Sequence, residues 1–178
     1  MNTRPEISEY NPFYETYIKK IPEGDISQIL NEQCEKTAAT LKELSEKQAL
    51  FRYRPDKWSI KEVMGHVTDT ERIMSYRLLS IARGETVSLP GFDQNAYVEN
   101  ASFDKMSLED ILAHFIAVRN ATVLLLKSLS DTDWLKSGFA NEAKVTVRAL
   151  AYIIAGHERH HFELINERYL KSANFPAK

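Results

Sequence analysis

Residues that cross-link or interrupt a fold are scarce in this chain. Its 178 residues include six glycines and six prolines, too few for a β-sandwich or β-barrel with a turn about every ten residues. The only cysteine, Cys34, cannot form an intrachain disulfide, and this favours a reducing compartment. With 43% apolar and 27% charged residues, the composition is that of a globular protein, and we predict one domain spanning residues 1–178.

An excess of positive charge and long apolar runs are also missing. Lysine and arginine number 23 against 25 acidic residues, a formal charge of -2, so nucleic acid is not an expected partner. No segment approaches the roughly 18 apolar residues of a membrane span. The N-terminal segment carries Arg4, Glu6, Glu9 and Glu15 and lacks the apolar core of a signal peptide. We therefore predict a cytoplasmic protein that binds neither nucleic acid nor a membrane.

Four segments show the apolar periodicity of helices. They begin at or near Asp25, Ser59, Ser107 and Thr146, and their apolar positions continue to Leu44, about Arg83, Leu129 and about Leu170. The second has the clearest start, because Ser59 and Glu62 form a capping box and Trp58 can pack onto Val63. No segment alternates with a period of two for long enough to predict a strand. The pattern predicts an all-α four-helix bundle, with residues 1–24 as an extension packed on it.

The connection between the second and third helices is unusually long. It extends from Gly84 to Met106, well beyond an ordinary helix connection, so it either crosses the bundle or serves a site. It contains Leu-Pro-Gly-Phe-Asp at positions 89–93, followed by Gln94 and Tyr97. These residues fit two interpretations, a packed crossover with aromatic anchors and a lid over a site.

Two histidines occupy positions of the fourth helix that should be apolar. Alternating steps of three and four residues from Val147 reach His157 and His161, so both imidazoles fall on the inward stripe. At about 1.5 Å and 100° per residue, they stand one turn apart on one face, close enough to hold one metal ion. The spacing therefore predicts a bidentate metal clip.

A useful metal site needs a third ligand, and the second helix offers His66. It lies on or beside the buried face of that helix. His160 points about 60° away from His157 in projection, and His114 is expected at an interface or in solvent. We therefore predict that His66, His157 and His161 bind the metal.

Other interpretations of these histidines are weighed against this one. Buried imidazoles can also serve structure alone, although each ring nitrogen then needs a partner. Residues 157–161 fit the H-E-x-x-H pattern of zinc proteases, but the metzincin extension would need glycine and histidine where Leu164 and Glu167 stand. A di-iron bundle would need a second E-x-x-H motif besides Glu158 and His161. A mononuclear tris-histidine site fits best.

From about Tyr10 to Tyr169 the sequence resembles the DinB-like family of metal-dependent four-helix proteins, in the branch that includes metal-dependent hydrolases and bacillithiol transferases. The motifs that carry the resemblance are Lys57 to Val63 leading to Gly65-His66, Tyr76-Arg77, Leu89 to Asp93 with Tyr97, and Val147 to Leu150 leading to His157 and His161. The resemblance implies the metal triad His66, His157 and His161. It also implies a long second connection that crosses the bundle, and frequently a homodimer.

Three hypotheses for function follow. In the first, a divalent metal activates a low-molecular-weight thiol, similar to bacillithiol, for transfer to an electrophile. In the second, the metal activates water for hydrolysis of an ester or amide, with Glu158 as a candidate base. In the third, the bundle binds metal or acts as a stress protein without catalysis. Open coordination positions on a tris-histidine site favour the two enzymatic hypotheses.

The residues do not select one metal, because imidazole suits several first-row ions. One ion per chain is expected, zinc or nickel first, with iron or manganese as alternatives. Asp69, Arg77, Asp93 and Tyr97 join Glu158 as candidates to support the ligands or touch the substrate. Cys34 is expected in the core, so any sulfur chemistry would use a thiol carried by the substrate.

Overall fold

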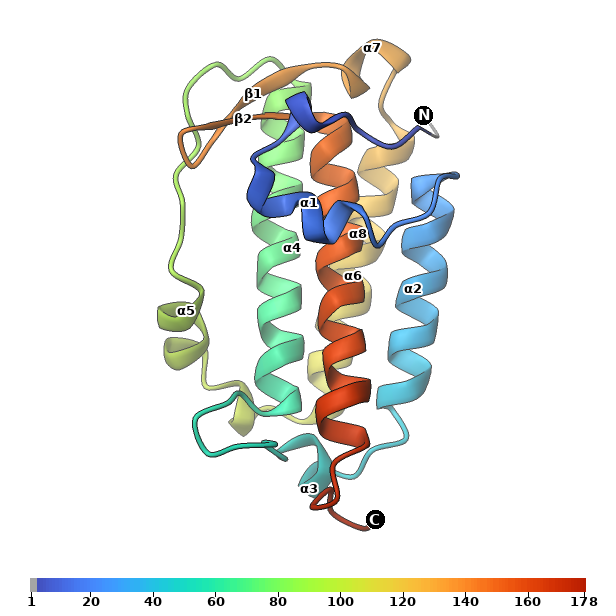
Figure 1. Ribbon diagram of the computed structural model, residues 1–178, viewed down its shortest axis with the longest axis vertical. Coiled ribbons are helices and arrows are strands. Elements are labelled where there is room, and N and C mark those ends of the chain that lie inside the picture. Colours follow the sequence, from blue (N-terminus) through green and yellow to red (C-terminus); the bar gives the residue numbers. More distant parts are fainter. Residues whose placement is uncertain (1–2) are drawn as a thin grey trace.

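Within residues 3–178, which the computed structural model describes, four long helices form a bundle (Figure 1). These are α2 (Ile26–Leu41), α4 (Ile60–Ala82), α6 (Leu108–Lys127) and α8 (Val147–Leu164). Four short helices lie between or before them, namely α1 (Glu15–Ile18), α3 (Glu46–Ala49), α5 (Gln94–Ala101) and α7 (Asp131–Trp134). The predicted all-α four-helix bundle is confirmed. No helix in this part of the chain has both the length and the apolarity that crossing a membrane requires.

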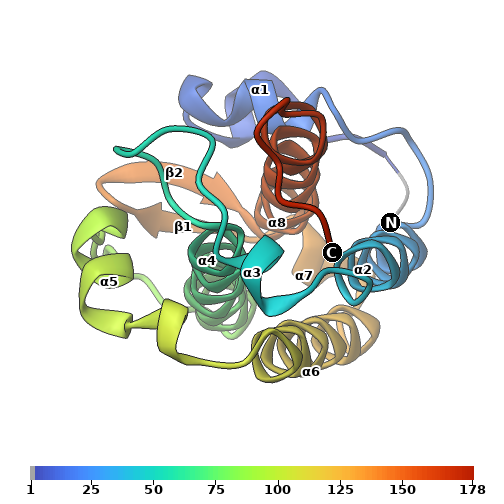
Figure 2. The ribbon, with the colours of Figure 1, turned by 90° about the horizontal axis from the view of Figure 1, so that it is seen from below.

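The four long helices are not arranged in chain order around the bundle. Both α4 and α2 pack against α6 and α8, which places α2 opposite α4 and α6 opposite α8 (Figure 2). The chain direction in Figure 1 shows that α4 and α6 are parallel neighbours, as are α2 and α8. Parallel neighbours cannot be joined by a short loop, since the chain must first return along the length of the bundle.

The connection from Gly84 to Met106 makes this return beside α4 (Figure 1). It is packed along its course, because Leu89, Val98 and Phe103 are buried. Phe103 lies so close to Gly65 of α4 that a Cβ at that position would meet its ring at 2.5 Å. The predicted crossover is therefore confirmed, and these contacts favour a packed segment over a mobile lid.

The residues predicted to begin the helices form the expected capping hydrogen bonds. Ser59 Oγ accepts a hydrogen bond from the Glu62 amide at 3.0 Å, and the Glu62 carboxylate accepts one from the Ser59 amide at 2.8 Å. Thr146 caps α8 in a similar way, by accepting a hydrogen bond from the Ala149 amide. At its other end α8 continues into a π-helical segment, Ile165–Leu170, so the fourth predicted helix reaches its expected end in a changed helical form.

The expectation that the chain has no strand is wrong. Residues Ser137–Ala140 (β1) and Ala143–Thr146 (β2) form an antiparallel hairpin just before α8. Each strand is only four residues long, too short for a period-two pattern to be recognised. The turn residues Asn141 and Glu142 both have positive φ, at 50° and 62°, which suits the two-residue turn of a hairpin. Glutamate is not a usual residue at such a position, so the turn has no clear sequence signal.

The apolar core consists of two clusters, one toward each end of the bundle. The upper cluster in Figure 1 includes Ile18, Leu30, Leu78, Leu126, Leu150 and Tyr152, and the lower cluster includes Leu41, Met64, Phe115, Ile165 and Tyr169. In α4, α6 and α8, most of the buried residues at the boundary between these clusters are polar: His66, Thr68, Thr70, Glu71, Arg119, Thr122, His157 and Glu158. This polar layer contains the chemistry of the bundle.

The segment before α2 packs across α8 (Figure 1). Ile18 and Ile21 are fully buried in the upper cluster, and Arg4 donates a hydrogen bond to the Ile21 carbonyl at 2.7 Å. Glu9 pairs with Arg148 of α8 and accepts a hydrogen bond from Thr146 at 2.7 Å. These contacts lie in the stretch expected to pack on the bundle as an extension; the division of the whole chain into one domain stays a prediction.

Candidate metal centre

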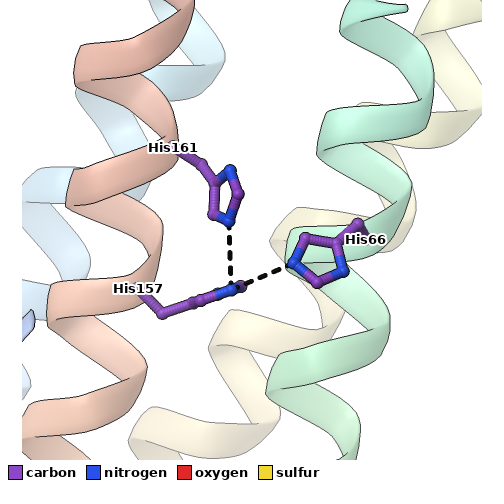
Figure 3. Close-up of side chains that lie close together, drawn as sticks. All are labelled: His66, His157 and His161. Atoms are coloured by element: carbon purple, nitrogen blue, oxygen red, sulfur yellow. Dashed lines mark hydrogen bonds between the residues drawn. The ribbon is translucent and has the colours of Figure 1, made fainter. Parts of the chain in front are cut away.

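Three histidine side chains meet between α4 and α8 (Figure 3). His66 projects from α4 toward His157 and His161, which stand one turn apart on α8. The Nε2 atom of His157 lies 3.1 Å from Nε2 of His66 and 3.2 Å from Nε2 of His161. Within residues 3–178, these three form a group whose ligand atoms all lie within 4.8 Å of one another, with no carboxylate or thiol among them.

The spacing of these nitrogens fits a metal ion. Zinc–nitrogen bonds of about 2.0–2.1 Å place two ligands of a tetrahedral site about 3.3 Å apart. The two short distances at His157 are close to that value. The Nε2 atom of His157 carries either one lone pair or one proton. It can therefore form one good hydrogen bond, and hydrogen bonding alone does not explain two neighbouring nitrogens. The observed convergence therefore suits a shared cation.

Burial keeps all three imidazoles neutral. Desolvation lowers the pKa of His66 to about 4 and that of His161 to about 3. For His157 desolvation, reinforced by the neighbouring histidines, holds the pKa well below its ordinary value. Neutral rings retain the lone pairs that a metal needs, so the site is ready to bind a cation at neutral pH.

Three residues around the triad were not predicted as part of the site. The ring of Trp58 lies 4.9 Å from that of His66, and the ring of Tyr17 lies edge-on to His157 at 5.5 Å. Thr70 places its hydroxyl 3.4 Å from Nδ1 of His66, where it can accept the proton of a metal-bound imidazole. Thr70 follows His66 by one helical turn, and this spacing could have identified it.

Glu158, the candidate base, does not belong to the group formed by the histidines. Its Oε1 accepts a hydrogen bond from Thr37 of α2 at 2.8 Å, and its Oε2 lies 2.7 Å from the Arg119 guanidinium of α6. Glu158 is 2% exposed, so these partners enclose it. The geometry thus gives this carboxylate a partner other than a reacting water.

Asp69 and Arg77 have other partners on and beside α4. Asp69 forms an ion pair with Arg72, one turn further along the helix, at 2.7 Å. Arg77 donates a hydrogen bond to the Pro90 carbonyl at 2.5 Å and anchors the crossover segment. Since it follows His66 by eleven residues, it stands about 16 Å further along the axis of α4. Neither contact connects these side chains to the triad.

Asp93 and Tyr97 lie in and beside α5. Asp93 caps this helix, because its carboxylate accepts hydrogen bonds from the amides of Asn95 at 2.9 Å and Ala96 at 3.2 Å. Tyr97 is 48% exposed and packs against the ring of Phe92 at 5.3 Å. Both side chains therefore contribute to the structure of the crossover segment.

The remaining histidines and the cysteine lie outside the group of three. The ring of His160 packs edge-on against His161 at 5.1 Å and against Tyr17 at 5.4 Å, and His114 is exposed on α6. Cys34 is buried among apolar residues of the lower cluster, and this burial raises the pKa of its thiol to about 11. A thiol of this kind is a poor nucleophile at neutral pH.

The fold and the three-histidine group define a helical bundle with a candidate metal centre between two of its helices. The family model of the DinB superfamily matches residues 29–165, and the chain belongs to that superfamily. Among solved structures, YfiT from Bacillus subtilis, described as a probable metal-dependent hydrolase with an unusual four-helix bundle topology, matches with a TM-score of 0.74. The two are 18% identical, and the match covers 93% of this chain and 91% of YfiT. No curated protein sequence matches the chain.

Proposed function

We propose that this chain is a metal-dependent enzyme that transfers a low-molecular-weight thiol, similar to bacillithiol, to an electrophilic substrate. The observation that carries the proposal is the convergence of three neutral imidazoles with no protein nucleophile or base in the group. A bound divalent cation would supply the missing activation, because it lowers the pKa of a thiol and favours the thiolate. The substrate's own sulfur then serves as the nucleophile.

The residues around the site would hold the cation, shield two of its ligands and leave one side open to a substrate. His66, His157 and His161 would hold the cation, and Thr70 can fix the orientation of the His66 ring. Trp58 and Tyr17 cover the His66 and His157 rings with apolar surface. His161 is the least buried ligand, so a substrate would approach from its side. In the reaction the sulfur forms a bond to the electrophilic carbon, the leaving group departs, and the thiol proton goes to solvent.

A metal-dependent hydrolase is the second candidate, and the similarity in fold to YfiT favours it. Here water would replace the thiol as nucleophile. The contacts of Glu158 weaken this alternative, because the residue expected to act as base is enclosed by Arg119 and Thr37. A thiol needs less help from a base, since its ordinary pKa is far lower than that of water.

An assay with two substrate classes separates the candidates. The purified full-length chain, loaded with zinc or nickel, is given glutathione, cysteine, coenzyme A or bacillithiol together with a chromogenic electrophile, and separately p-nitrophenyl esters. Conjugation with one thiol supports the transferase, and ester cleavage without thiol supports the hydrolase. Bound metal with neither reaction supports a non-enzymatic metal-binding or stress protein.

The variant His157→Ala provides the control for metal dependence in this assay. It should lose both the metal and the activity, while His114→Ala, at an exposed histidine of α6, should keep both. If wild type carries no stoichiometric metal, or His157→Ala carries as much as wild type, the proposed site is wrong.

The identity of the metal, the assembly and the location complete the proposal. Zinc or nickel is our first choice because imidazole suits both ions, with iron and manganese as alternatives. We propose a homodimer and a cytoplasmic location, the latter because the chain has one cysteine and that cysteine is buried as a free thiol. Elemental analysis and light scattering of the purified protein test the first two points.

A further inference from the structure

The guanidinium of Arg119 joins all four long helices inside the polar layer. From α6 it donates two hydrogen bonds to Glu71 of α4, Nε to Oε1 at 2.9 Å and Nη2 to Oε2 at 2.8 Å. Its Nη1 donates to the Leu30 carbonyl of α2 at 2.7 Å and lies 2.7 Å from Oε2 of Glu158 in α8. Arg119 is 0% exposed, and Thr37 of α2 completes the group through Glu158.

Two of the helices joined by Arg119 are those that carry the metal ligands. Glu158 lies between His157 and His161 on α8, and Glu71 lies just over one turn after His66 on α4. The separation and rotation of α4 and α8 determine whether the His66 nitrogen reaches the other two. Arg119 acts from α6, which lies opposite α8, so it crosses the interior to bind Glu158.

Stability alone does not explain three charges buried at this point. Removing charged groups from water costs several kcal/mol per ion, and replacing a buried ion pair by apolar side chains of similar volume is often neutral or stabilising. A guanidinium with fixed, planar donors does, however, define the positions of its partners more closely than apolar packing does. The main contribution of the cluster is therefore to define the relative positions of the helices.

We propose that Glu71, Arg119 and Glu158 are positioning residues of the metal site, which hold α4 and α8 in the register that brings His66 to His157 and His161. This inference rests on the metal centre of the proposed function. It gives Glu158 a role through its contact with Arg119 instead of a role as base. None of the three belongs to the histidine group, so each would act through the positions of the helices.

Metal binding by an apolar triple variant tests the proposal. The variant Glu71→Leu/Arg119→Met/Glu158→Leu replaces the three charged side chains with apolar ones of broadly similar size and should fold, because it leaves no unpaired charge. We expect it to bind zinc at least tenfold more weakly than wild type, the effect typical of residues that support metal ligands. With cobalt as the probe, its visible absorption spectrum should also differ from that of wild type, since this spectrum reports ligand geometry.

Two further variants separate positioning from general destabilisation. Arg119→Lys keeps the positive charge but has no planar fork, so it should give an intermediate affinity for zinc. Leu126→Ala removes apolar volume from the same helix in the upper cluster, and it should leave the zinc affinity and the cobalt spectrum unchanged while the protein is folded.

The results of these experiments distinguish a failure of the positioning role from a failure of the proposed function. A folded triple variant with the zinc affinity and cobalt spectrum of wild type would overturn the positioning role and leave the proposed function intact. Equal losses in the triple variant and in Leu126→Ala would overturn it too, because they would indicate a general effect of stability. A wild-type protein that binds neither zinc nor cobalt would overturn the proposed function together with this inference.

Discussion

The backbone carbonyl of Tyr17 lies directly against the Cα of Gly156, and a Cβ at residue 156 would overlap with the carbonyl oxygen. This contact brings the end of α1 onto α8 one residue before His157. The ring of Tyr17 packs edge-on to the His157 imidazole at 5.5 Å. Gly156 therefore lets the N-terminal segment cover the metal helix at the position of a ligand.

Substitution of this glycine should separate the two segments. Gly156→Ala is expected to lower the free energy of unfolding by about 1–3 kcal/mol, as in other overpacked cores, because backbone atoms must move to admit the methyl group. Urea denaturation measures the loss. Gly91→Ala is the control, since a methyl group there meets only the exposed side chain of Asn141, which can rotate away. Equal losses in both variants would contradict the steric explanation.

Removal of metal should destabilise the folded state. A ligand at 100 times its Kd adds about 2.7 kcal/mol to the free energy of unfolding, so treatment with a chelator should lower the wild-type unfolding midpoint. His66→Ala loses one of the three ligands, and its midpoint should be the same with and without metal. Thermal unfolding of both proteins, each with zinc and with chelator, tests this. An identical metal-dependent shift in the variant would exclude His66 as a ligand.

The hydroxyl of Thr70 should contribute to metal affinity through His66. The distance of 3.4 Å to Nδ1 is long for a hydrogen bond, so we expect a loss of about tenfold for Thr70→Val, the lower end of the range for such supporting residues. Thr70→Ser keeps the hydroxyl and should remain within a few-fold of wild type. Isothermal titration with zinc measures both affinities. The hydroxyl has no such role if valine and serine bind zinc equally well.

The thiol of Cys34 should react slowly and in a pH-dependent way. Burial raises its pKa from the ordinary 9.0 to about 11, so at pH 8 it has about a hundredfold less thiolate than an exposed cysteine. Alkylation by iodoacetamide, followed by mass spectrometry, should be slow in the native protein and fast in urea. The native rate should rise with pH up to about 11. Fast native labelling at pH 7 would indicate that the thiol is accessible and activated.

Asp93 should matter as a helix cap. Asp93→Ala removes the acceptor for two amides at the start of α5, whereas Asp93→Asn keeps a good capping side chain. We expect faster hydrogen exchange in α5 for the alanine variant and exchange close to wild type for asparagine. The expected cost of the alanine variant is about 0.5–2 kcal/mol of local stability. A conjugation activity that is lost in both variants would instead assign the carboxylate to the substrate.

The parts of the fold that depend on local patterns could be predicted from the sequence. The capping box of Ser59 and Glu62 marked the start of α4, and the length of the 84–106 segment indicated a crossover. The hairpin before α8 could not be predicted in this way, because its strands are short and its turn uses Glu142 at positive φ. Its first strand packs against α4, and Leu89 of the crossover segment forms a β-bridge with Ala140. Tertiary contacts of this kind leave no periodic signal in the sequence.

The histidines could be predicted as a group because each replaces an apolar residue on an inward stripe. Arg119 is also at such a position, four residues after Phe115 in α6, and its charge could have been recognised as a sign of a buried partner. The identity of its partners could not, since Glu71 and Glu158 belong to helices distant in sequence. Trp58 and Tyr17 likewise reach the triad from outside the helices that carry the ligands.

The parallel arrangement of α4 and α6 has a consequence for folding kinetics. The helices α4 and α6 can pack together only after the whole 84–106 segment has returned along the bundle. The packing of α2 on α8 likewise joins helices that are separated by more than a hundred residues of chain. The mean sequence separation of contacting residues is thereby higher than in a bundle whose consecutive helices form hairpins, and folding slows as this separation grows. During this interval the apolar faces of the helices remain without partners, which makes the nascent chain more dependent on protection from aggregation than its simple helical composition suggests.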